Sequence, residues 1–221
     1  MRPGDVQAMN RVIPILRRET GKFDAPVVTL IARTKRDPFK VLISCLLSLR
    51  TNDQTTLSAS ARLFAIAQSP KEILNIPAAT LERTIYPVGF YRVKTRVLHS
   101  VSKDLLERFG GKVPSEIDDL LSLKGVGRKT ANLVRTLGYG KQGICVDIHV
   151  HRISNRLGFI RTRNPHETEF ELRKKLPRRH WIRYNDVLVA YGQHVCRPVS
   201  PWCSRCKVRP YCARAGVTHS R

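Results

Sequence analysis

Residues 113–149 constrain the fold more strongly than any other part of the chain. Two short helical patterns flank the segment Leu-Lys-Gly-Val-Gly at 123–127, because apolar residues recur at helical spacing on both sides of it. We expect Ser115 to cap the first helix, with an acidic capping-box partner three residues later. The second helix is expected to begin near Arg128 and to stop at Gly138.

The two glycines of this segment, Gly125 and Gly127, favour a binding turn. A turn without Cβ atoms lets backbone N–H groups point outward. These groups would lie at a helix N-terminus, whose partial positive charge suits a phosphate. The pattern indicates a helix-hairpin-helix, which holds the DNA backbone without reading its sequence. An ordinary connection between two helices would show the same five residues.

Two side chains that could take part in catalysis follow the turn. Lys129 is placed in the first turn of the second helix, where the positive charges of Lys124 and Arg128 favour a neutral, nucleophilic amine suited to Schiff-base chemistry. Asp147, eighteen positions later, could stabilise positive charge developing on a sugar ring. Spacing alone favours a plainer interpretation, in which Lys129 binds a phosphate and Asp147 caps a helix starting near Ile148.

The charge balance points to a polyanionic partner. The chain of 221 residues has 40 Lys and Arg against 17 Asp and Glu, a net charge of +23. Such an excess speeds association with nucleic acid; an anionic membrane is the second candidate, but no long apolar segment supports it. A generally basic proteome would also explain the charge. Residues 1–22 contain no continuous apolar run, so we expect a cytoplasmic, nucleoid-associated protein, with an organellar transit peptide as the alternative.

The remaining sequence predicts an all-α fold, since no convincing strand pattern is found. Helices are expected over residues 1–21, 39–49, 55–68, 93–109 and 148–157, from 164, and over 179–195. The helix 93–109 is indicated by apolar residues that recur every fourth position from Val93 to Phe109. The loop 86–92 places aromatic residues between basic ones, which could stack on bases or simply pack in the core.

Four cysteines near the end of the chain predict a metal or cluster site. They are Cys196, Cys203, Cys206 and Cys212, with the spacing C-x6-C-x2-C-x5-C. A tetrathiolate zinc site usually has two close pairs, and only Cys203 and Cys206 form such a pair. A [4Fe–4S] cluster accepts uneven spacing and is favoured, with zinc kept as the alternative. Cys45 and Cys145 lie in apolar runs and are expected to be buried thiols.

Together these features resemble the endonuclease III family of DNA base-excision glycosylases, over nearly the whole chain. The resemblance rests on residues 123–131, residues 146–149 and the cysteine spacing. It implies a [4Fe–4S] cluster and two all-α domains with DNA across the cleft between them. The implied domains are a six-helix barrel at 24–132, containing a helix-hairpin-helix at about 115–137 that is shared at the boundary, and a cluster domain made of 1–23 and 133–221.

The same resemblance implies the reaction. A damaged base is flipped out of the duplex, Lys129 attacks C1′ of the deoxyribose, and the resulting Schiff base drives β-elimination, with Asp147 assisting. The implied substrates are oxidised or ring-broken pyrimidines and abasic sites in double-stranded DNA. We expect a monomer, because nothing in the sequence demands a larger assembly. The implied DNA-contacting residues are Arg50, Phe90, Lys124, Gly125, Val126, Gly127, Arg128, Thr130 and His149.

Two positions depart from the usual pattern of the family. Arg50 stands where members usually have a Gln that reaches into the gap left by the flipped base, and Phe90 stands where a Leu wedge is common. Adenine mismatch glycosylases of the same group use a Glu where Cys45 stands, and the thymine mismatch branch commonly has Tyr in place of Lys129. A noncatalytic DNA-binding protein would need no Lys129–Asp147 pair.

Overall fold

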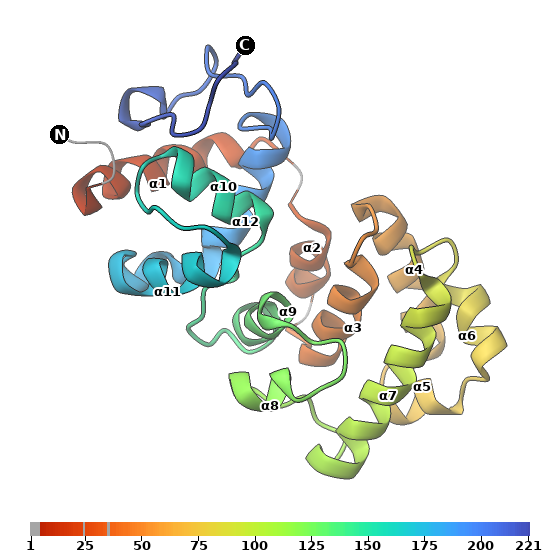
Figure 1. Ribbon diagram of the computed structural model, residues 1–221. Coiled ribbons are helices and arrows are strands. Elements are labelled where there is room, and N and C mark those ends of the chain that lie inside the picture. The colour runs from red at the N-terminus through yellow and green to blue at the C-terminus, as the bar shows by residue number, and fades with distance from the viewer. Residues whose placement is uncertain (1–4, 24, 35) are drawn as a thin grey trace. The chain divides into compact units, whose positions relative to one another are not determined.

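The computed structural model describes residues 5–23, 25–34 and 36–221, and within these ranges the regular elements are all helical. This confirms the all-α prediction. The chain divides into two compact units: Val27–Gly143, and Ile144–Arg221 together with the described part of Met1–Pro26. Figure 1 shows the helices of each unit, which are considered separately below. No helix in the described ranges is long and apolar enough to cross a bilayer.

The unit Val27–Gly143 is organised around one helix that is buried along most of its length. Its elements, in chain order, are α2 (Val27–Thr34), α3 (Pro38–Ser48), α4 (Asp53–Ile66), α5 (Pro70–Asn75), α6 (Ala78–Ile85), α7 (Tyr91–Phe109), α8 (Ile117–Leu121), α9 (Arg128–Leu133) and the π-helical turn η1 (Val134–Gly138). Residues 41–47 of α3 are all buried. A helix without a polar face must be covered on every side, and α2, α4, α7, α9 and η1 pack against α3.

Glycine permits the closest of these contacts. A Cβ atom at Gly138 would lie 2.9 Å from Cα of Pro38, so a larger residue would push η1 away from the start of α3. The long helix α7 ends at Gly110 with φ 59°, as the sequence predicted. Its predicted register was wrong at the start, because Val93 is 47% exposed while Lys94 is buried.

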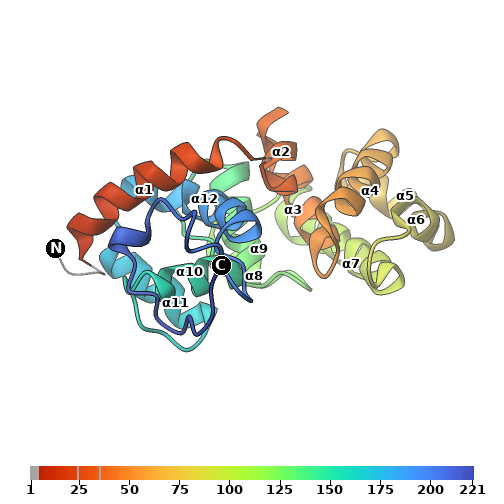
Figure 2. The same ribbon diagram turned by 90° about the horizontal axis from the view of Figure 1, so that it is seen from above.

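The second unit is built on α12. Its elements are α1 (Val6–Thr20), α10 (Ile148–Arg156), α11 (Pro165–Lys175), the 3-10 turn η2 (Arg178–His180), α12 (Trp181–His194) and the 3-10 turn η3 (Arg209–Tyr211). Tyr184, Leu188 and Tyr191 of α12 are at most 2% exposed and belong to one apolar cluster with α1 and α10. Figures 1 and 2 both show α1 alongside α12.

The two units differ in their limits from the predicted domains. The predicted boundaries fall at 23/24 and 132/133, whereas the units meet at 26/27 and 143/144. Residues 133–143 group with the first unit because η1 continues directly from α9 and packs on α3. The description of the units as a barrel domain and a cluster domain stays a prediction.

Asp37 provides a test of this packing, because its side chain caps α3. Its Oδ1 accepts hydrogen bonds from the backbone N–H groups of Phe39 (3.0 Å) and Lys40 (3.1 Å). We expect Asp37→Ala to lower the free energy of unfolding by about 1 kcal/mol in urea titrations. Asp5→Ala is the matched control, since its carboxylate accepts one longer bond from Gln7 N (3.4 Å) at the exposed start of α1. Equal losses would contradict a special role for the α3 cap.

Candidate active site and nucleic-acid interface

The predicted hairpin is present between α8 and α9. Gly125 has φ 79°, a conformation that L side chains rarely adopt, and a Cβ there would lie 3.0 Å from Cγ1 of Val97 on α7. Gly127 precedes α9 in an extended conformation, and apart from its two chain neighbours no described residue lies within 4 Å of the position that its Cβ would take. Gly125 is therefore required by the fold, whereas Gly127 keeps the entrance to α9 open.

The predicted cap of the first hairpin helix was wrong. Helix α8 begins after Glu116 without a side-chain cap, and Ser115 Oγ instead donates to the Glu116 carboxylate at 3.2 Å. Lys141 donates to Ser115 Oγ at 2.6 Å and to Glu116 Oε1 at 2.8 Å, and Arg135 donates to Glu116 Oε2 at 2.9 Å. The hydrogen bonds that the Glu116 carboxylate accepts, chiefly the one from Lys141 and then the one from Arg135, lower the pKa of Glu116 to about 2. Partners 19 to 26 residues away in the sequence have replaced the local capping box.

The hairpin residues divide into exposed cations and buried supports. Lys124 and Lys129 are exposed and Arg128 is partly exposed, so their charges can meet a polyanion. Val126 and Thr130 are only 7% and 3% exposed, so they are buried supports of the hairpin. The sequence did not show this division, because Lys124, Val126, Arg128 and Thr130 were all predicted alike as DNA-contacting residues.

Lys129 stands in the first turn of α9 and close to Cys45 of α3. Burial raises the pKa of the Cys45 thiol to about 12, and the nearby positive charge of Lys129 acts in the opposite direction. Cys45 and Cys145 are both buried, as expected.

Asp147, in the second unit, is the N-cap of α10. Its Oδ1 accepts from the backbone N–H groups of His149 and Val150, both at 2.9 Å. This confirms the capping interpretation, and it leaves Oδ2 outside the cap. His149 is partly buried against α12, where a Cβ at Gly192 would lie only 2.4 Å from its Nδ1. The same nitrogen is 3.1 Å from Nη2 of Arg152.

The structure brings Arg50 and Phe90 together. The guanidinium carbon of Arg50 lies 5.5 Å from the centroid of the Phe90 ring, within the range of a cation–π contact. Both residues have left-handed backbones, with φ 53° and 59°. Phe90 is 60% exposed, so it is not a core residue, and core packing is the wrong interpretation for it.

Lys94 is a site residue that the sequence reasoning missed. Its side chain is buried, and Nζ donates to the carbonyls of Leu47 (2.6 Å) and Leu49 (2.5 Å) and to Oγ1 of Thr51 (3.1 Å). Burial lowers its pKa to about 8. The available signal was its place on the stripe Lys94, Leu98, Val101 and Leu105, which is the buried face of α7.

The four predicted cysteines line one pocket, together with Trp202, Val195 and Arg156 among others. All four are free thiols. Arg156 Nη1 is 3.5 Å from Sγ of Cys196, and the hydroxyl of Tyr191 donates to Sγ of Cys206 at 3.2 Å. Neither this pocket nor any other place among the described residues has a group of three or more His, Cys, Asp or Glu side chains that could hold a single metal ion.

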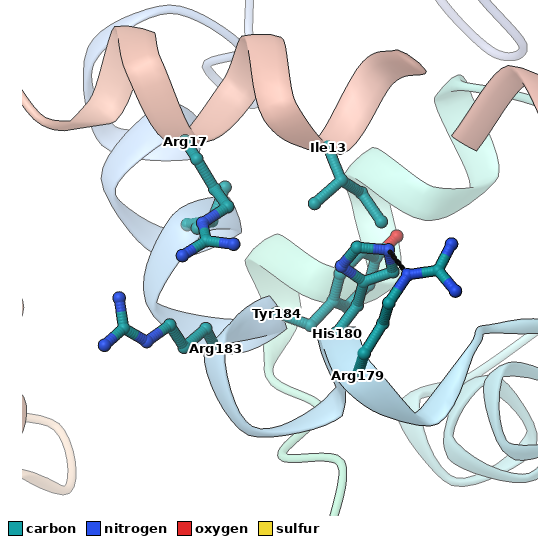
Figure 3. Close-up of a pocket in the computed structure, with 7 residues that line it drawn as sticks. Ile13, Arg17, Arg179, His180, Arg183 and Tyr184 are labelled. Atoms are coloured by element: carbon teal, nitrogen blue, oxygen red, sulfur yellow. Dashed lines mark hydrogen bonds between the residues drawn. The ribbon is translucent and has the colours of Figure 1, made fainter. Parts of the chain in front are cut away.

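A second basic feature is a pocket at the start of α12 (Figure 3). Arg17 of α1, Arg179 and His180 of η2, and Arg183 of α12 line it over the apolar side chain of Ile13. Burial, then the charges of Arg179 and Arg17, lower the pKa of His180. None of the side chains that line this pocket is acidic, so the pocket adds to the positive field of this unit.

Comparison with known proteins agrees with this arrangement. The pattern of the HhH-GPD superfamily of base excision DNA repair proteins matches residues 43–178. Endonuclease III of Thermotoga maritima is 44% identical over 176 residues, which cover 80% of this chain and 83% of that protein. A solved non-covalent endonuclease III–DNA complex is similar with a TM-score of 0.84 and 31% identity, over 95% of each chain.

A second solved structure, a trapped covalent intermediate of endonuclease III with DNA, has a TM-score of 0.76 and 35% identity over 81% of this chain and 85% of that one. With these matches over most of its length, the chain belongs to the HhH-GPD superfamily of base excision DNA repair proteins and, within it, to the endonuclease III family.

Proposed function

We infer that this chain is a base excision repair enzyme, a DNA glycosylase with AP lyase activity that removes oxidised pyrimidines. The observation that carries this inference is the exposed Lys129, held at the start of α9 directly after the glycine turn. A related endonuclease III was trapped with DNA as a covalent intermediate, and an amine at the position of Lys129 can form such a bond. A protein that only binds DNA has no use for a nucleophile there.

The proposed reaction starts when the damaged base leaves the stack. The neutral amine of Lys129 attacks C1′ of the deoxyribose, the C1′–N bond to the base breaks, and the base departs with the electron pair and a proton. Opening of the sugar gives a Schiff base, and loss of a C2′ proton then expels the 3′ oxygen, which cuts the strand. Asp147 stabilises positive charge on the sugar and takes part in activating Lys129.

DNA is held in this proposal mainly through its phosphates. The backbone N–H groups around Gly125 and Gly127 bind one phosphate, and the exposed charges of Lys124 and Arg128 add attraction. Arg50 and Phe90 enter the gap left by the flipped base. The net charge of +23 adds general electrostatic attraction to DNA and makes binding strongly salt-dependent. We expect a monomer acting on double-stranded DNA where the chromosome lies, in the cytoplasm.

We also propose a [4Fe–4S] cluster on Cys196, Cys203, Cys206 and Cys212. Four free thiols in one partly apolar pocket fit such a group, because each thiolate binds its own iron and the inorganic sulfides need no protein ligand. Arg156 and Tyr191 supply hydrogen-bond donors to two of the sulfurs. When bound, the cluster would cross-link residues 196–212, the segment that follows α12.

Lys129→Ala tests the nucleophile. We expect no covalent adduct when the variant is mixed with borohydride and a duplex that carries one oxidised pyrimidine, whereas binding to that duplex falls only modestly, since one basic residue of 40 is lost. Lys124→Ala is the matched control, because it removes the same charge from the same hairpin and keeps the adduct. An adduct formed by Lys129→Ala would remove this residue from the mechanism.

Asp147 allows capping and catalysis to be measured separately. Asp147→Asn keeps an oxygen that can accept the two α10 bonds but loses the charge, so we expect near-normal stability and a strand-cleavage rate reduced on the order of a hundredfold. Asp147→Ala loses the cap as well and should unfold with about 1 kcal/mol less free energy. Full activity of the Asn variant would refute a catalytic charge, and equal stabilities of the two variants would refute the cap.

Cys203→Ser tests the cluster. The purified variant is expected to lose the brown colour and the bound iron and sulfide of the wild type, and to melt at a lower temperature, because the chain end is no longer cross-linked. Cys145→Ser, which changes a buried thiol outside the pocket, should keep both iron and colour. A colourless wild type containing zinc would overturn the iron–sulfur assignment.

A further inference from the structure

The turn that carries Arg50 is held in place by hydrogen bonds from one buried lysine, Lys94. The three N–H groups of the Lys94 ammonium meet three acceptors, which are the carbonyls of Leu47 and Leu49 and the hydroxyl of Thr51. Two of these acceptors flank Arg50 directly. The 47–51 turn is therefore tied to α7 on both sides of the one residue with a left-handed backbone.

The same hydroxyl joins this turn to the loop that carries Phe90. Thr51 Oγ1 also accepts from the backbone N–H of Gly89 at 3.1 Å. A Cβ at Gly89 would lie 2.6 Å from the carbonyl oxygen of Arg50, so the two backbones touch at this point. Lys94, Thr51 and Gly89 thus form one connection between the segments on which Arg50 and Phe90 stand.

This connection holds two unfavourable conformations. Left-handed backbone is uncommon for residues other than glycine and persists only where the surroundings enforce it. Arg50 and Phe90 both adopt it, and their side chains stack on one another. Without the Lys94 bonds the 47–51 turn could relax to an extended path, and the guanidinium would no longer stay over the Phe90 ring.

We propose that Lys94 is a positioning residue that determines which opposite base the enzyme prefers, by fixing Arg50 in one orientation. The proposal rests on the inferred entry of Arg50 and Phe90 into the DNA. An arginine offers donors only, and guanine has the O6 acceptor where adenine has an amino group. A fixed Arg50 therefore favours lesions opposite guanine over the same lesions opposite adenine, and a mobile Arg50 discriminates poorly.

The test compares one lesion in two contexts. Single-turnover cleavage rates are measured for 5-hydroxyuracil opposite guanine and opposite adenine, and their ratio is taken for each protein, so that any inactive fraction cancels. We expect the wild type to favour guanine about tenfold. The ratio should fall toward one in Lys94→Met and in Arg50→Ala, and Lys94→Arg, which keeps the donors, should restore part of it.

Lys103→Met is the matched control, because Lys103 is an exposed lysine of the same helix, and its ratio should equal that of the wild type. If Lys94→Met does not fold, Thr51→Val decides, since it removes the hydroxyl shared by Lys94 and Gly89. A folded variant with an unchanged ratio, or a wild type without preference for guanine, would overturn the proposal. Failure of the proposed function would differ, because the wild type would then form no borohydride adduct with a single-stranded abasic site, where no opposite base exists.

Discussion

The burial of residues 41–47 of α3 is the constraint on which the unit Val27–Gly143 depends. A helix covered on every side fixes the positions of all its neighbours, because protein interiors are close-packed and yield little. Gly138 lets η1 approach its first turn, and Gly125 lets the hairpin approach Leu46 and Val97. Arg50 lies two residues after Ser48, the last residue of α3. The nucleophile candidate on α9 and the arginine that enters DNA in our proposal are therefore positioned by one rigid element.

Features that depend only on residues close together in the sequence were predictable. The hairpin followed from two glycines between helical repeats, and α7 followed from its four-residue period, because both depend on neighbours within a few positions. The grouping of the four cysteines was predictable for the same reason, since 17 residues contain all of them. The all-α fold needed only the absence of alternating patterns. In each case the information and the structure that it specifies lie on the same short segment.

Features that depend on distant partners were not predictable. Ser115 matched a capping box, but its hydroxyl oxygen instead accepts a hydrogen bond from Lys141, which is 26 residues away in the sequence. Lys94 looked like one more basic residue, although it bonds to a carbonyl 47 positions earlier. The contact between Arg50 and Phe90 joins two loops that are separated in the sequence by the three helices α4, α5 and α6. Periodicity carries no record of such pairs, and cations in particular are ambiguous in a chain with 40 of them.

Asp147 shows that a structural and a catalytic interpretation of one residue need not compete. The two backbone bonds of the α10 cap both end on Oδ1, so the cap occupies half of the carboxylate and fixes the direction of the other half. A catalytic group must be held within a narrow range of orientations before the substrate arrives, and a free aspartate side chain would rotate. Placing the carboxylate at a helix N-terminus supplies that restraint through two backbone N–H groups.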